Sequence, residues 1–262
     1  SFFMRENKRG QVTIFVIISI IIVASIFLFF VLKGGFKPST TGGNEANLNS
    51  FLDICLEDSI KENLKIIFAQ GGNIDPDLSI NFQFNNEEMT EITYLCYQEN
   101  FYLPCVNQEP VFLQHLKNEI HDSLEEEVSD CLDVLERDLQ DRWEVVEVKR
   151  NGFDISFDSR NLIVKIDSQF TLTKNEETIT QENLKVIFPT RGFQIAEVVQ
   201  EIVSQETRYC SFNKLGYMIA YPEWRISSYV NGDSIKIYTV ENKESYEKFR
   251  FAIRGCVIPA GF

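Results

Sequence analysis

The sequence predicts an α+β protein in which an N-terminal transmembrane helix precedes an ectodomain of amphipathic helices packed on antiparallel β-sheet. Three observations support this fold class: a long apolar run without charge, two segments with apolar residues every three or four positions, and a later stretch of alternating strands. The expected parts are a basic leader (1–10), a membrane helix (11–33), a flexible linker (34–46), a helical module with a small hairpin (47–142), and an antiparallel β-rich module with one or two helices (143–262).

The apolar run contains no charged residue between Arg9 and Lys33. At about 1.5 Å per residue it forms roughly 35 Å of helix, enough to cross a hydrocarbon core of about 30 Å. The expected partner of Val12 to Leu32 is therefore a lipid bilayer. A secretory signal peptide is the competing interpretation, but the run exceeds a usual signal core and the following "GGFKPSTTGG" offers no small-x-small cleavage site.

Positive charge flanks the run unequally. Arg5, Lys8 and Arg9 precede it, and Lys33 and Lys37 follow it. The more basic flank of a membrane helix tends to stay in the cytoplasm. We therefore expect a single-pass protein of the cell membrane with a cytoplasmic N-terminus and an extracellular ectodomain.

The residues before the apolar run carry a resemblance. "KRGQ" followed by an apolar helix resembles the class III signal of archaeal type IV pilins, which implies cleavage by a prepilin peptidase between Gly10 and Gln11. The freed helix could then self-associate in a filament. "KRGQVTIF", together with "CLEDSIKENLKIIFAQGG" downstream, is also similar to uncharacterised single-pass surface proteins of DPANN archaea, a resemblance that implies an envelope location and no particular activity.

The part of the chain beyond the apolar run is strongly acidic. The first 33 residues hold four of the 25 Lys and Arg and one of the 39 Asp and Glu, so a net charge of −17 remains on the rest. Such a charge repels phosphate backbones, and we expect no nucleic-acid partner. The favoured interpretation of this charge is a solvated acidic surface without a specific partner. The alternative is that cations or envelope proteins with basic surfaces bind to it.

Six cysteines lie beyond the apolar run, where disulfides persist if that part is extracellular. Fifteen pairings are possible. Placement favours Cys55 with Cys131 on two helical patterns, Cys96 with Cys105 around a short loop, and Cys210 with Cys256 around the last module. Free buried thiols are the alternative.

An amphipathic helix is expected at the start of the ectodomain, ending at Gly71 and Gly72. Its apolar stripe consists of Leu48, Leu52, Leu56, Ile60, Leu64 and Ile67. The segments "LSINFQF" and "EITYLCY" then predict a pair of strands.

A second, longer helix is expected to begin near Pro110. Its apolar stripe consists of Leu116, Ile120, Leu124, Val128, Leu132, Leu135 and Leu139. Such a stripe can pack within the chain or form a coiled coil between chains, and packing within the chain is favoured because the first helix offers a partner.

From Trp143 onward the sequence predicts an antiparallel meander. Its strands are "WEVVEV", "FDISF", "LIVKIDSQFTLT" and "TITQENLKVIF", and the first two are separated by Asn151-Gly152, a hairpin signal. A helix over "FQIAEVVQEIVSQ" follows. A last hairpin turns at Asn231-Gly232-Asp233, before a strand around "EKFRFAIRG".

Motifs that carry catalysis were not found. His115 and His121 are six residues apart, which places them on different faces of a helix, and neither belongs to an HExxH motif. The sequence contains no GxSxG, P-loop or GxGxxG pattern. We therefore predict no catalytic residue, no metal site and no cofactor, and expect a protein that is not an enzyme.

The stretch "YLCYQENFYLP" is the candidate recognition surface. Tyr94, Tyr97, Phe101 and Tyr102 are aromatic groups of the kind enriched in binding interfaces, although such rings also cap local cores. The expected function is a membrane-anchored structural or adhesion protein of an archaeal envelope, possible alternatives being a tethered module that binds peptide, glycan or cation, or a surface hydrolase.

Overall fold

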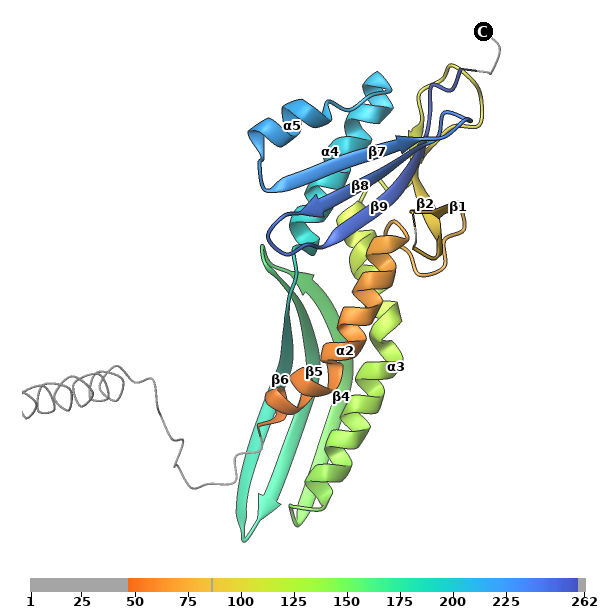
Figure 1. Ribbon diagram of the computed structural model, residues 1–262. Coiled ribbons are helices and arrows are strands. Elements are labelled where there is room, and N and C mark those ends of the chain that lie inside the picture. The colour runs from red at the N-terminus through yellow and green to blue at the C-terminus, as the bar shows by residue number, and fades with distance from the viewer. Residues whose placement is uncertain (1–46, 86, 259–262) are drawn as a thin grey trace, which may run out of the picture. The chain divides into compact units, whose positions relative to one another are not determined.

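The computed structural model describes residues 47–85 and 87–258. The predicted leader, membrane helix and linker, including Gly10 and Gln11, lie outside the described residues. Among the described residues, no helix combines the length and apolar character needed to cross a bilayer. The elements (Figure 1) are α2 (Leu48–Ala69), β1 (Ser79–Gln83), β2 (Met89–Tyr97), β3 (Val106–Asn107), α3 (Phe112–Gln140), β4 (Val145–Phe157), β5 (Asn161–Lys174), β6 (Glu177–Pro189), α4 (Gly192–Tyr209), α5 (Lys214–Ala220), β7 (Trp224–Val230), β8 (Lys236–Asn242) and β9 (Lys248–Arg254).

The two long helices form where the apolar stripes predict them. Asn47 caps α2, because its side-chain oxygen accepts a hydrogen bond from the backbone N–H of Ser50 at 3.2 Å. Every predicted stripe residue of α2 and α3 is buried. The stripes meet each other and the sheet within one chain, as predicted, and the side chain of Asn63 donates to the carbonyl of Ser123 at 2.9 Å between the helices.

The strands β4, β5 and β6 form an antiparallel sheet in chain order, as the meander predicts, with α2 beside β6 and α3 beside β4. The structure corrects one predicted turn. Asn151-Gly152 does not end a strand, because β4 continues through it and the register against β5 shifts between Arg150 and Phe153. Gly152 has a φ of +103°, a value that bulges and hairpin turns both require, so the dipeptide alone does not distinguish them.

The second sheet has the order β1-β2-β9-β8-β7, with β3 also paired to β2. The predicted hairpins β1–β2 and β7–β8 are present, and their sheet is joined by a parallel pairing of β2 with β9 that the sequence does not predict. Both strands are buried along five consecutive residues, Ile92–Cys96 and Phe249–Ile253. Burial on both faces is typical of central, parallel-paired strands.

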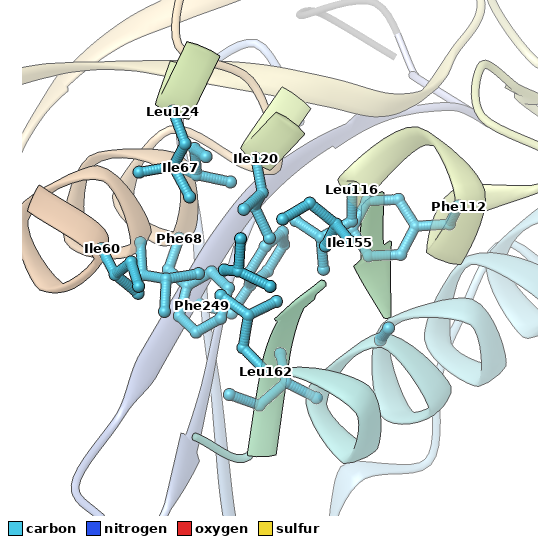
Figure 2. Packing of buried hydrophobic residues seen from close by; sticks show 14 of the residues in the cluster. Ile60, Ile67, Phe68, Phe112, Leu116, Ile120, Leu124, Ile155, Leu162 and Phe249 are labelled. Carbon is cyan, nitrogen blue, oxygen red and sulfur yellow. The ribbon is translucent and has the colours of Figure 1, made fainter. Parts of the chain in front are cut away.

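The described residues, 47–85 and 87–258, belong to one compact unit, and the segments on either side of residue 142 contribute to the same core. Figure 2 shows why: Phe68 of α2, Leu116 of α3, Ile155 of β4 and Phe249 of β9 belong to a single buried cluster. The hairpin of the first predicted module also contributes its strands to the sheet of the second. The two modules therefore share their core.

Three disulfides join the six cysteines in the pairs that placement favours. Cys55 and Cys131 connect α2 to α3 with 6.0 Å between their Cα atoms. Cys96 and Cys105 close the loop after β2, and Cys210 and Cys256 link the end of α4 to the segment after β9. The structure is thus an α+β fold that three disulfides cross-link.

Candidate functional site

The predicted aromatic surface is divided by the fold. Tyr94 is 6% exposed and packs edge-on against Tyr97 at 5.1 Å between ring centroids, and burial raises the pKa of Tyr94 to about 12. Phe101 and Tyr102 are instead exposed on the disulfide-closed loop, beside Leu103. Two of the four predicted rings therefore cap a local core, and two remain available for contact.

A larger candidate site is a groove of about 1140 Å³. Its lining comes from α2, the turn between β1 and β2, the turn between β4 and β5, the junction of β6 with α4, the turn between β8 and β9, and β9 itself. The structure brings together six segments spread over nearly two hundred residues of the chain. Its volume is slightly above that of most small-molecule sites, which span about 300 to 1000 Å³.

Apolar side chains line part of the groove. Leu64 and Phe68 come from α2, and Phe188 and Pro189 come from the end of β6. Phe68 also packs edge-on against Phe249 with 5.7 Å between ring centroids, so the core holds it from behind. The groove can therefore remove apolar atoms of a ligand from water, at about 25 cal/mol per Å².

The charge of the groove is opposite to that of the chain. Its lining holds six cations and three carboxylates, whereas the whole chain carries a net charge of −14; the charged lining residues are Lys61, Lys65, Arg160, Arg191, Lys248 and Arg250, with Glu87, Glu88 and Glu247. A positive cleft in a negative protein attracts anionic ligands selectively. Cations, which the overall composition predicts as partners, are disfavoured here.

Two of the cations are held by carboxylates. The guanidinium of Arg250 donates to both oxygens of Glu87, at 2.6 and 3.0 Å, and lies 4.0 Å from the ring centroid of Phe84. This hydrogen bonding lowers the pKa of Glu87. Arg250 is only 9% exposed, and its Nε has no hydrogen-bond partner among the described residues.

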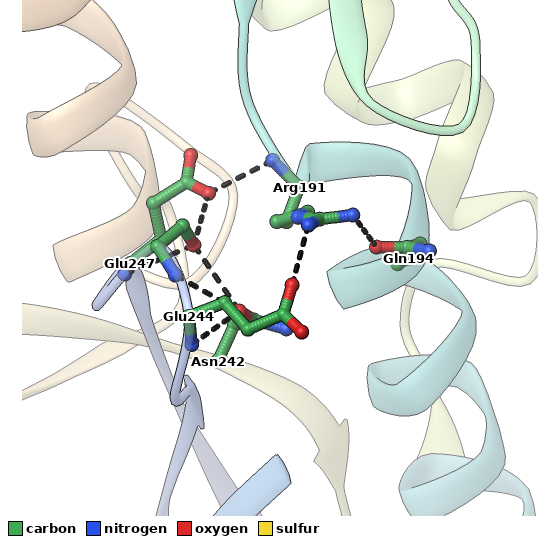
Figure 3. A network of polar contacts seen from close by, with 6 residues as sticks. Arg191, Gln194, Asn242, Glu244 and Glu247 are labelled. Carbon is green, nitrogen blue, oxygen red and sulfur yellow. Dashed lines mark hydrogen bonds and ion pairs between the residues drawn. The ribbon is translucent and has the colours of Figure 1, made fainter. Parts of the chain in front are cut away.

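Arg191 belongs to a polar network that ties the β8–β9 turn to the start of α4 (Figure 3). Its guanidinium donates to Glu244 at 2.7 Å and to Gln194 at 3.2 Å, while its backbone N–H donates to Glu247 at 2.8 Å. Glu247 also accepts from the hydroxyl of Ser245 at 2.7 Å. A carboxylate of the protein thus lies at the N-terminal end of α4, where a bound anion is otherwise favoured.

The other four cations have different surroundings. Within residues 47–85 and 87–258, the side chains of Lys61, Lys65, Arg160 and Lys248 make no hydrogen bond and no ion pair. All four residues are exposed. They are therefore available to an external anion.

The polar groups of the groove do not form an evident catalytic set. The lining contains no histidine or cysteine, and the hydroxyl of Ser245 donates a hydrogen bond to the carboxylate of Glu247. His115 and His121 both lie on α3, away from the lining, and His121 stacks on Phe153 at 4.3 Å between ring centroids. Among the described residues, no group of three or more His, Cys, Asp or Glu side chains could hold a metal ion.

Comparison of the chain with protein-family models, curated proteins and solved structures finds no match. The functional argument therefore depends on the chain's own residues. Sequence analysis did not identify the groove, because its cations are isolated residues on separate elements and form no motif. The one available signal was the pair Lys61 and Lys65, four positions apart on the polar side of a predicted helix.

Proposed function

We propose that the chain is a membrane-anchored protein of the archaeal cell surface, with a structural or adhesive role. The observation that carries this proposal is that all six cysteines are paired in disulfides beyond an apolar segment long enough to span a bilayer. Disulfides persist in oxidising compartments outside the cytoplasm. The anchor is Val12 to Leu32, and the ectodomain is the compact unit of residues 46–262.

Surface labelling of intact cells tests the topology. A membrane-impermeant amine reagent should label exposed lysines such as Lys149 and Lys165 without cell lysis, and the protein should stay in the membrane pellet after a carbonate wash. Maleimide should react with its cysteines only after reduction and unfolding. Labelling that requires lysis, or free thiols in the unreduced protein, would contradict the extracellular placement.

A pilin-like subunit is the finer form of this proposal. It requires cleavage between Gly10 and Gln11 and packing of the freed apolar helices with one another. The resemblance of "KRGQ" to class III signals supports it. N-terminal sequencing of the membrane-derived protein tests it: a chain that begins at Gln11 supports a filament subunit, and a chain that retains Lys8 to Gly10 leaves a static anchor.

A tethered binding module is the second candidate. The observation that favours it is the large groove with an apolar lining and four exposed cations that have no partner among the described residues. An adhesive role and a binding role are compatible, because adhesion needs a recognition surface. A surface hydrolase lacks a comparable observation in its favour.

A further inference from the structure

The unpartnered cations of the groove are separated from one another. Lys61 and Lys65 lie one turn apart on α2, Arg160 lies between β4 and β5, and Lys248 begins β9. A single compact anion, such as a phosphate, would fill only a small part of a groove of about 1140 Å³. The distribution therefore fits a ligand that carries several separated negative charges.

The surroundings of the cations in the groove also favour a ligand that carries carboxylates. Two guanidinium groups of the groove already bind carboxylates, the buried Arg250 with Glu87 and the half-buried Arg191 with Glu244. The helix end that could have received a phosphate is filled by Glu247. Multiply charged phosphate ligands therefore find the strongest hydrogen-bond donors occupied. Spaced carboxylates need only the four exposed cations, which we call the rim of the groove: Lys61, Lys65, Arg160 and Lys248.

The apolar lining separates acidic peptides from acidic glycans. Leu64, Phe68, Phe188 and Pro189 offer no hydrogen-bond partner through their side chains, so sugar hydroxyl groups pressed against them would lose hydrogen bonds to water. Apolar peptide side chains gain free energy on the same surface. The ligand class that fits both the rim and the lining is a peptide that alternates acidic and apolar side chains.

A second copy of this chain is a poorer occupant. Its acidic stripe on α3 includes Glu125 and Glu126, but the neighbouring apolar residues Leu124 and Val128 are buried in the copy's own core. That stripe therefore brings carboxylates without apolar side chains for the groove. The net charge of −14 on each chain also opposes association of copies.

We propose that the groove between α2 and the β8–β9 turn binds an acidic, amphipathic peptide segment of another surface protein. Carboxylates of the segment pair with Lys61, Lys65, Arg160 and Lys248, and its apolar side chains cover Phe188 and Pro189. Arg250 supplies a second observation: it lines the groove, is 9% exposed, and keeps an Nε–H without an acceptor among the described residues. This inference narrows the ligand of the proposed binding role and does not depend on filament formation.

A direct binding measurement tests it. The full chain is placed in nanodiscs of phosphatidylcholine, and the probe is a fluorescein-labelled peptide in which glutamate alternates with leucine and phenylalanine. Fluorescence anisotropy should show saturable binding that weakens as salt rises, because rim charges are screened. The same peptide with glutamine in place of glutamate should bind at least about tenfold more weakly.

Charge reversal locates the site. The double variant Lys61→Glu/Lys65→Glu should raise the Kd of the probe at least about tenfold, since both residues are exposed and attraction becomes repulsion. The matched control is Lys149→Glu/Lys165→Glu, which makes the same charge change at exposed positions of β4 and β5 outside the lining. The control should leave Kd within about twofold. Equal effects of the two double variants, or no effect of either, would overturn the proposal.

Competitors decide the ligand class. Polygalacturonate, inorganic phosphate and phosphatidylserine vesicles should not displace the probe at concentrations where unlabelled peptide does. Displacement by any of them would overturn the assignment to a peptide. Probe binding that falls, instead of rising, as the concentration of nanodiscs carrying the chain increases would show that the occupant is a second copy and would overturn the proposal. The nanodisc measurement does not depend on cellular location, so failure of the anchoring proposal and failure of this inference are distinguishable.

Discussion

Removal of the Cys55–Cys131 disulfide should destabilise the ectodomain more than removal of Cys96–Cys105. The first bond joins residues 76 positions apart, and the second joins residues 9 positions apart. In the chain-entropy model the bonds restrict the unfolded chain by about 4.5 and about 2.6 kcal/mol, a difference of roughly 1.9 kcal/mol. The comparison of two disulfides in one protein cancels much of the error that affects either value alone.

The assay is urea unfolding of residues 46–262, which form a compact unit with their own core. The fluorescence of Trp224 reports the transition, because this side chain is 4% exposed in the fold. The double variants Cys55→Ala/Cys131→Ala and Cys96→Ala/Cys105→Ala are compared with the parent under non-reducing conditions. Equal losses, or a larger loss for the short loop, would refute the reasoning from loop length.

Three further changes have expected outcomes. Lys236→Met should lower the free energy of unfolding by about 3 to 5 kcal/mol in the same assay, because it leaves the buried carboxylate of Glu206 without its cation; a loss below about 1 kcal/mol would contradict this. The lowered pKa of Glu87 means that its pair with Arg250 stabilises the fold above pH about 4.5 and that this contribution is lost as pH falls through the folded pKa; an unshifted NMR titration of this carboxyl would be inconsistent. Gly72→Ala should cost about 1 to 3 kcal/mol, since φ is +101° and the new Cβ would lie 2.9 Å from an aromatic carbon of α3; an unchanged urea midpoint would oppose it.

Elements with strong local patterns were predictable from the sequence. The stripes of α2 and α3 repeat over several turns, so the packing face and the Cys55–Cys131 pairing both follow from them. The final hairpin was also predictable, because Asn231 accepts backbone hydrogen bonds within its own turn from Asp233 and Ile235. Local hydrogen bonding is what such turn signals encode.

Features that depend on distant residues were not predictable. The parallel pairing of β2 with β9 joins residues more than 150 positions apart, and apolar runs do not specify which strand they will meet. The short helix α5 was not predicted because its seven residues are too few for an apolar spacing to repeat, and none of them is buried. The groove was not predicted because Lys61, Arg160 and Lys248 come to line the same cavity only after folding.

The most direct test of the anchored surface protein is the intact mass of the unreduced chain, isolated from membranes of its native cell. The account predicts a chain that retains the apolar segment from Gln11 to Lys33 and is six hydrogen atoms lighter than its reduced form, two for each of the three disulfides. A chain that begins beyond Lys33, or one that carries all six thiol hydrogens, would contradict it.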